Sequence, residues 1–122
     1  MKLIVAGSRN IQYYETVKSA IDELVSQGMV INTIIDGTAK GVDELASRYA
    51  KENGIENLRV PAEWHLYRSG AGPVRNRKMA EMGDALLALW DGKSSGTKNM
   101  IKIANDMELQ VKIVIVADEK EV

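Results

Sequence analysis

The sequence has 122 residues, a formal net charge of −1, 45% apolar and 27% charged residues, which is typical of a single soluble globular domain. A net charge this close to zero excludes a general attraction to nucleic acid or to an anionic membrane. With one histidine and no cysteine, we expect no disulfide, no metal site and no cofactor. No apolar run approaches the ~20 residues of a membrane span and no signal peptide is evident, so a cytoplasmic protein without membrane contacts is expected.

Apolar runs alternate along the chain with segments of helical periodicity. The runs predict β-strands over residues 3–6, 31–35, 58–60, 85–90 and 111–116. The polar middle of the third run suits a strand at the edge of a sheet. Apolar spacing of three and four residues predicts helices over residues 12–27 and 42–53, and further helices before the fourth and fifth strands. Residues 61–70 form the longest segment without a regular pattern.

Residue types that favour helix ends mark the boundaries of these helices. Asn10 is a suitable N-cap for the first helix, and Gly28 and Gly54 are suitable stops for the first and second helices. Pro73 fits the first position of the third helix, where a missing N–H is tolerated. Thr97 fits the cap of the fourth helix.

The alternation of strands and helices predicts an α/β fold. We expect a single Rossmann-like three-layer domain over residues 1–117, with a five-stranded, mostly parallel sheet and helices on both faces. Residues 118–122 are predicted to be a short charged tail. In such a sheet, ligands bind outside the carboxyl ends of the strands, near the point where the strand order reverses.

Four polar loops each follow a predicted strand and should share that edge of the sheet. They hold eight basic and four acidic residues, so their net charge is 8 − 4 = +4 and the rest of the chain carries −5. This concentration predicts a site for a phosphate-bearing ligand, although surface loops are also polar for no functional reason. The basic residues are Arg9, Lys40, Arg68, Arg75, Arg77, Lys78, Lys93 and Lys98, and the acidic ones are Asp36, Asp43, Glu63 and Asp91.

Two of these loops are rich in glycine. Residues 37–41 and 92–97 could each direct several backbone N–H groups toward an anion at a helix start. Neither is a standard nucleotide motif. Leu87 stands where a Walker A loop ending in Gly92-Lys93-Ser94 requires its first glycine, and no Gly-x-Gly-x-x-Gly follows the first strand.

Single residues near this edge leave alternatives open. His65 is expected to be structural rather than catalytic. Trp64 and Trp90 either stack on a base or pack in the core. Asp43 lies in the first turn of a helix, where it could complement the helix dipole. Because it lies near Gly41, it could instead hold a ribose hydroxyl or order the loop.

Five motifs are spread along most of the chain. They are Gly7-Ser8-Arg9, the segment from Gly37 to Ala46, Pro61-Ala62-Glu63-Trp64, Ala71-Gly72-Pro73-Val74-Arg75-Asn76 and the segment from Trp90 to Thr97. Together these motifs resemble the YspA/YpsA-related branch of the SLOG superfamily. The resemblance implies a Rossmann-like domain that binds a nucleotide-derived small molecule of the NAD or ADP-ribose type, and a homo-oligomer. The expected ligand-binding residues are Gly7, Ser8, Arg9, Gly37, Thr38, Ala39, Gly41, Asp43, Arg75, Asn76, Gly92, Ser94, Ser95, Gly96 and Thr97.

The superfamily includes the LOG-type phosphoribohydrolases, which cleave the N-glycosidic bond of nucleoside monophosphates. Their pattern places an arginine at Arg75 and a Gly-Thr pair at Gly96-Thr97, but it places the catalytic glutamate at Met100. Cleavage through an oxocarbenium-like state needs a nearby carboxylate, which a methionine does not supply. The remaining candidates for catalysis are Arg75, Asp43, Glu44 and Asp91.

Three functions follow from these patterns. The leading hypothesis is a ligand-binding or sensor protein that holds a nucleotide phosphate at the carboxyl edge of the sheet, with Arg9 and Arg75 as charge partners. The first alternative is an N-ribosyl hydrolase with a non-standard carboxylate. The second is single-stranded DNA binding of the DprA type, against which the near-neutral charge argues. That alternative would use Arg68, Arg75, Arg77 and Lys78 along a backbone, and Trp64 or Tyr67 for stacking.

Overall fold

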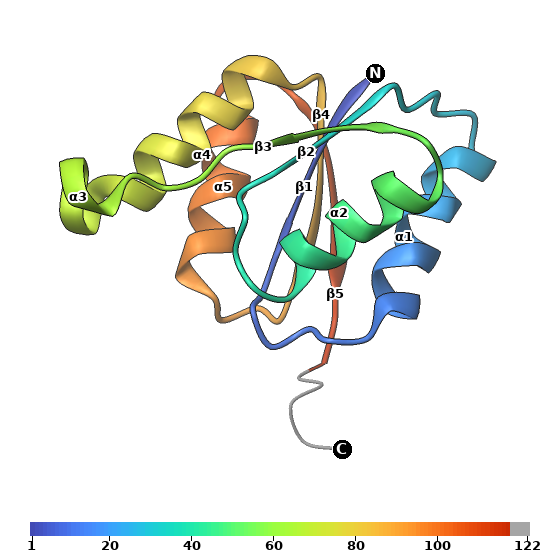
Figure 1. Ribbon diagram of the computed structural model, residues 1–122, viewed down its shortest axis with the longest axis horizontal. Coiled ribbons are helices and arrows are strands. Elements are labelled where there is room, and N and C mark those ends of the chain that lie inside the picture. Colours follow the sequence, from blue (N-terminus) through green and yellow to red (C-terminus); the bar gives the residue numbers. More distant parts are fainter. Residues whose placement is uncertain (118–122) are drawn as a thin grey trace.

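Five parallel strands form one sheet in the computed structural model, which describes residues 1–117. The strand order is β3-β2-β1-β4-β5 (Figure 1). This confirms the predicted α/β class and the edge position of the third strand, whereas the predicted charged tail lies outside the described residues. The strands are β1 (Lys2–Gly7), β2 (Thr33–Asp36), β3 (Glu56–Arg59), β4 (Ala85–Trp90) and β5 (Gln110–Ile115).

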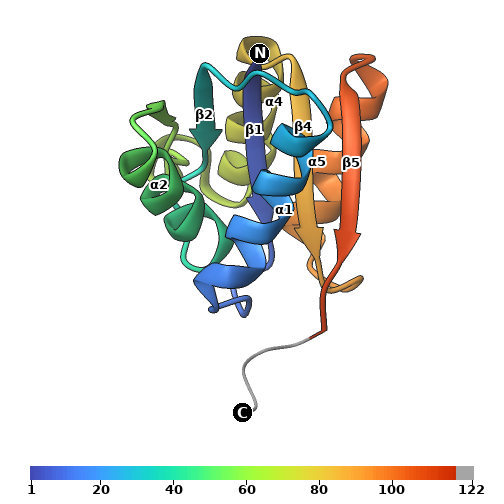
Figure 2. The ribbon, with the colours of Figure 1, turned by 90° about the vertical axis from the view of Figure 1, so that its right-hand side faces the viewer.

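Helices cover both faces of the sheet, as predicted. Helices α1 and α2 lie on one face, and α4 and α5 lie on the other (Figure 2). The chain builds outward from β1 to β3 and then returns to β4 and β5, so the order reverses between β1 and β4. The helices are α1 (Tyr14–Ser26), α2 (Val42–Glu52), α3 (Trp64–Tyr67), the 3₁₀ turn η1 (Arg68–Gly70), α4 (Ala71–Met82) and α5 (Ser95–Asp106).

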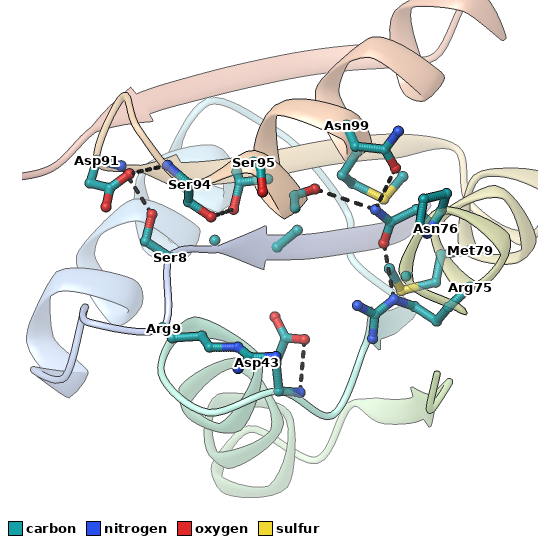
Figure 3. A pocket seen from close by; sticks show the side chains of 18 of the residues that line it. Ser8, Arg9, Asp43, Arg75, Asn76, Met79, Asp91, Ser94, Ser95 and Asn99 are labelled. Atoms are coloured by element: carbon teal, nitrogen blue, oxygen red, sulfur yellow. Dashed lines mark hydrogen bonds between the residues drawn. The ribbon is translucent and has the colours of Figure 1, made fainter. Parts of the chain in front are cut away.

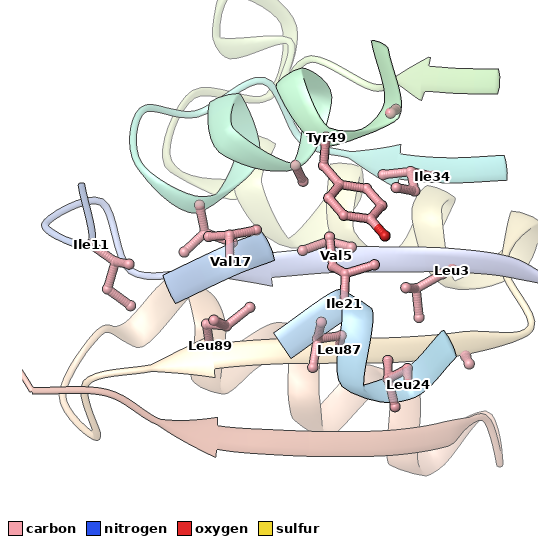
Figure 4. Packing of buried hydrophobic residues seen from close by; sticks show 14 residues of the cluster. Leu3, Val5, Ile11, Val17, Ile21, Leu24, Ile34, Tyr49, Leu87 and Leu89 are labelled. Atoms are coloured by element: carbon pink, nitrogen blue, oxygen red, sulfur yellow. The ribbon is translucent and has the colours of Figure 1, made fainter. Parts of the chain in front are cut away.

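The continuous apolar run of β1 reflects burial on both faces. Leu3 and Val5 pack against α1 and α2, in a cluster that also holds Ile21 and Leu87 (Figure 4). The alternate residues of β1, including Ile4, pack in the second cluster beneath α4 and α5. Because side chains alternate along a strand, only a strand covered on both faces is apolar at every position.

The predicted helix stops are confirmed, but the predicted start of α1 is wrong. Gly28 and Gly54 follow the last helical residues with φ of 101° and 64°, values that glycine adopts without strain. Asn10 does not cap α1, which begins at Tyr14. The N–H of Ile11 instead donates to the Ser8 carbonyl at 3.3 Å, and the buried Ile11 side chain holds this turn in the core.

The start of α4 lies before the predicted position. Residues 61–70 are not irregular throughout, because they contain α3 and η1. Their apolar residues are exposed, so they show no buried helical face that a periodic pattern could reveal. The turn η1 leads directly into α4 at Ala71, which makes Pro73 the third helical residue. Its missing N–H is still tolerated there, since the first four N–H groups of a helix have no partner within it.

The start of α5 also differs from the prediction. Ser94, not Thr97, is the residue that precedes the first helical turn. Thr97 is the third helical residue and is buried, and its Oγ1 lies 3.3 Å from Ser94 Oγ. Met100, Ile101 and Ala104 face the core, as predicted. None of the described helices has the length and apolar character needed to cross a membrane.

Candidate functional site

A cavity of about 680 Å³ opens over the carboxyl ends of β1 and β4, where the strand order reverses (Figure 3). Its volume is within the range of small-molecule sites in proteins. The loops after the first four strands contribute to its wall, together with α4 and the start of α5. The predicted site residues that line it are Gly7, Ser8, Arg9, Ala39, Asp43, Arg75, Asn76, Asp91, Ser94, Ser95, Gly96 and Thr97.

The remaining predicted site residues are not part of the cavity wall. Gly37, Thr38, Gly41 and Gly92 support the loops behind it. Glu44 lies on the exposed side of α2, where its carboxylate accepts a hydrogen bond from Arg59 Nη2 at 3.1 Å. Its position directs it toward β3 and away from the cavity, so the structure separates Glu44 from the other catalytic candidates.

The loop after β2 does not present its N–H groups to the cavity, contrary to prediction. The N–H groups of Gly37 and Ala39 donate to Asp43 Oδ2 at 3.0 and 3.1 Å. The N–H of Thr38 donates to Asp36 Oδ1 at 2.8 Å. These three donors are therefore satisfied by carboxylates of the chain itself, which hold the loop in its conformation.

Packing within the protein accounts for two glycines of this loop. A Cβ on Gly37 would lie 2.9 Å from Asp43 Oδ2 and would overlap the Arg75 guanidinium. Gly41 has a φ of 80°, and a Cβ there would lie 2.6–2.8 Å from the Arg9 main chain. These glycines allow close approach of protein segments to each other, rather than of the backbone to phosphate oxygens.

Two arginines line the cavity from opposite elements. Arg9 follows β1, and Arg75 lies on α4, where it donates to the Gly37 carbonyl and to Asn76 Oδ1. Within the described residues, neither guanidinium has a carboxylate oxygen within 4.0 Å. Burial lowers the pKa of Arg75, Asp43 raises it, and the like charge of Arg9 lowers it further. The site thus holds a partly buried cation whose hydrogen-bond acceptors, the Gly37 carbonyl and Asn76 Oδ1, are neutral.

Asp43 is the most buried carboxylate of the cavity wall, with 5% of its surface exposed. Its burial raises the pKa from 3.8 to about 6, against the lowering effect of the hydrogen bond from Ala39 N–H. Asp36 raises this pKa as well, and Arg75 lowers it. Figure 3 shows the Asp43 side chain pointing into the cavity. Most molecules therefore carry this charge at pH 7.5, but it is lost at moderately acidic pH.

Asp91 organises the approach to α5. Its Oδ1 accepts the N–H groups of Lys93 and Ser94, each at 2.8 Å, and these two bonds are the main reason that its pKa lies below the usual value. Its own N–H donates to Ser8 Oγ at 3.1 Å, which links the loops after β1 and β4. Trp90 Nε1 donates to the Ser94 carbonyl at 3.0 Å. Asp91 and Trp90 thereby fix the first turn of α5 against the cavity.

That first turn leaves backbone donors open toward the cavity. No side chain caps α5, and Ser95, Gly96 and Thr97 are its first three helical residues. The first N–H groups of a helix have no partner within it, and they carry the positive end of the helix dipole. All three residues line the cavity, so this wall suits an anion.

An amide pair holds α4 and α5 together at the back of the cavity. Asn76 is 4% exposed, and its Nδ2 donates to Asn99 Oδ1 at 2.9 Å and to the Gly96 carbonyl at 3.3 Å. Because Asn76 Oδ1 accepts from Arg75, the amide links the guanidinium to the first turn of α5. Asn76 thus helps to fix the relative positions of the Arg75 guanidinium and the first turn of α5, the two groups that attract an anion.

The predicted net charge of +4 is not found at the cavity itself. Its charged lining residues are two arginines and two aspartates, so the formal charge of the wall is zero. Lys78 pairs with Glu63 at 3.0 Å on the surface. The cavity attracts anions through a few placed groups rather than through an excess of basic residues. The basic loop residues that do not line it are Lys40, Arg68, Arg77, Lys78, Lys93 and Lys98.

Several lining residues were not predicted as site residues. Ser69, Met79 and Asn99 had no signal in the sequence, since their place depends on how α4 and α5 pack. Asn10 and Trp64 were noticed for other reasons, the first as a cap and the second as a residue for stacking or the core. Trp64 lines the cavity mouth and is 54% exposed. His65 is exposed beside it and does not line the cavity. The described residues contain no cluster of ligands suited to a metal.

The comparisons with known proteins place these features in a family. Residues 1–67 match the model of the YspA, cpYpsA-related SLOG family, and this segment is more than half of the chain. The chain belongs to this family. It is also similar to the Gene 61 protein of Mycobacterium phage D29, with 28% identity over 116 residues that cover 90% of this chain and 93% of that protein. SLOG membership supports a nucleotide-related function at a coarse level, and the matched segment ends at the last residue of α3.

Proposed function

We propose that the cavity binds a phosphate-bearing, nucleotide-type ligand, and that the protein acts as a ligand-binding or sensor domain. The observation that carries this proposal is the pair Arg9 and Arg75. Both line the cavity, and neither has an ion-pair partner among the described residues. Arg75 is partly buried, and a partly buried charge without a carboxylate in contact is costly, so a bound anion reduces that cost. Arg9 is exposed and adds a second positive charge at the cavity wall.

The start of α5 supports the same assignment from the other wall. Its uncapped N–H groups suit a phosphate, and Asn76 connects them to Arg75. Trp64 at the mouth has an exposed ring on which a base can stack. SLOG membership agrees with a ligand of this class.

The experiment that tests the proposal is isothermal titration of the protein with AMP, ADP-ribose, NAD and cyclic nucleotides. We expect at least one of them to bind, and native mass spectrometry of the purified protein to show a co-purified nucleotide. Failure of all of these ligands to bind at millimolar concentration would contradict the proposal.

Hydrolysis of an N-ribosyl bond is a second candidate because of one observation. Asp43 supplies a buried carboxylate in the cavity wall with a pKa of about 6, and such a group can act as a general base near neutral pH. Met100 also lines the cavity, so the carboxylate expected there in a phosphoribohydrolase is absent. Chromatography of AMP and NAD after long incubation with concentrated protein tests this function, and the absence of any released base would exclude it for these substrates.

A further inference from the structure

We propose that Asp43 recognises a hydroxyl group of the ligand, so that the cavity selects a ribose phosphate over a phosphate compound that lacks ribose hydroxyls. This inference rests on the proposed function, because it concerns the same cavity. It goes further by assigning the ligand a hydroxyl donor and by naming the residue that accepts from it.

The two carboxylate oxygens of Asp43 have different roles. Oδ2 accepts both N–H groups of the preceding loop, from Gly37 and Ala39. No hydrogen bond within the described residues uses Oδ1, although Asp43 as a whole residue is only 5% exposed and its side chain points into the cavity (Figure 3). Among the described residues, Asn10 Oδ1 is the one buried side-chain oxygen without a partner, so Asp43 Oδ1 is open to the cavity rather than enclosed. A donor group of a ligand in the cavity can therefore reach it.

The surroundings of Asp43 decide which donor fits. A phosphate is excluded at this oxygen, since two anions would repel each other. A cationic group is disfavoured as well, because Arg9 and Arg75 line the same cavity. A neutral hydroxyl meets both conditions and gains a charge-assisted hydrogen bond.

The two walls of the cavity then receive different parts of one molecule. The uncapped first turn of α5 lies across β1 from Asp43, as Figure 3 shows for Ser95 and Asp43. A ligand with a phosphate at one end and free hydroxyls nearby satisfies the helix start, Arg75 and Asp43 together. A ribose phosphate has this arrangement.

The substitution Asp43→Asn tests the inference with little change in shape. The amide oxygen can still accept the N–H groups of Gly37 and Ala39, while the amide nitrogen replaces the acceptor that faces the cavity with a donor. Glu44→Gln is the matched control, because it makes the same chemical change at the next residue, outside the cavity.

Three probes separate the possible outcomes at pH 7.5: AMP, 2′,3′-dideoxy-AMP and inorganic pyrophosphate. For the wild type and for Glu44→Gln, we expect AMP to bind roughly tenfold to a hundredfold more tightly than dideoxy-AMP, the range of one hydrogen bond to a charged group. For Asp43→Asn, the ratio of the AMP affinity to the dideoxy-AMP affinity should fall to near one, while the affinity for pyrophosphate should be unchanged.

Equal binding of AMP and dideoxy-AMP to the wild type would overturn the inference and leave the proposed function intact. An unchanged ratio in Asp43→Asn would overturn it as well. If none of the probes binds, this inference is overturned, while the proposed function is decided by the separate titration with ADP-ribose, NAD and cyclic nucleotides.

If Asp43→Asn does not fold, the wild type still gives an answer. Protonation of Asp43 at pH 5 should lower the ratio of the AMP affinity to the dideoxy-AMP affinity. Both probes carry the same phosphate and meet the same facing charges, Asp36, Arg75 and Arg9, so other effects of pH cancel in this ratio. A ratio that is identical at pH 5 and pH 7.5 would overturn the inference.

Discussion

Arg75 on α4 donates a hydrogen bond from Nη1 to the main-chain carbonyl of Gly37, which directly follows β2. This bond joins a helix on one face of the sheet to the loop that enters α2 on the other face. It also holds the guanidinium at the cavity wall, between Asn76 on one side and Asp43 on the other. Contacts within the chain therefore help to fix the position of Arg75 at the cavity wall.

Gly37→Ala adds only one methyl group, but it should lower both the stability of the protein and its affinity for a nucleotide. The added Cβ would overlap the Arg75 guanidinium and crowd Asp43, so we expect a loss of about 1–3 kcal/mol in the free energy of unfolding and weaker nucleotide binding. Gly70→Ala is the matched control, because nothing lies within 4 Å of its Cβ position. Chemical denaturation and titration calorimetry measure both effects, and equal behaviour of the two variants would contradict this account of the loop.

Stability should fall as the pH rises through the titration range of Asp43. The folded protein holds this carboxyl with a pKa of about 6, above the value of 3.8 for an exposed group, so the folded state binds the proton more tightly. This contribution to stability is complete below about pH 4 and is lost as the pH rises through about 6, with a total of at most about 3 kcal/mol.

Asp43→Asn cannot lose that proton and provides the comparison. The difference in unfolding free energy between the variant and the wild type should shift in favour of the variant between pH 4 and pH 6, and then stay constant. Urea denaturation at several pH values measures this difference. A difference that does not depend on pH would show that Asp43 titrates normally in the folded protein.

The Trp64 side chain should strengthen the binding of ligands that carry a base and should have no effect on the affinity for ligands without one. Its ring is exposed at the cavity mouth, and stacking on a base is worth about 1–3 kcal/mol. We expect Trp64→Ala to weaken AMP binding roughly tenfold and to leave ribose 5-phosphate binding unchanged, as measured by calorimetry. A parallel loss for both ligands would instead indicate a structural role for α3.

Patterns in the sequence were sufficient to predict the sheet and the edge on which the cavity lies. Strands covered on both faces are apolar at every position, and helices that pack on one side have a clear period, as in β1 and α2. Helix starts were less predictable. Asn10 has the chemistry of a cap, but burial of Ile11 keeps it in a turn, and Asn10 lines the cavity instead.

The detailed chemistry of the site depended on contacts between distant residues. The glycines of residues 37–41 suggested a phosphate cradle, yet their loop folds around the Asp43 carboxylate. Likewise, the pairing of Asn76 with Asn99 depends on how α4 packs against α5. Composition and spacing do not show whether a given N–H group donates its hydrogen bond to a ligand or to another residue of the chain.

The most direct test of the central claim compares two arginines on the same helix. Arg75 lines the cavity, whereas Arg77 is exposed and lies outside it. Titration calorimetry with ADP-ribose should show wild-type affinity for Arg77→Gln and a loss of at least about tenfold for Arg75→Gln, because a charge-assisted contact to phosphate is removed. Circular dichroism melting checks that both variants are folded. Wild-type affinity in a folded Arg75→Gln protein would contradict the assignment of this cavity as the phosphate site.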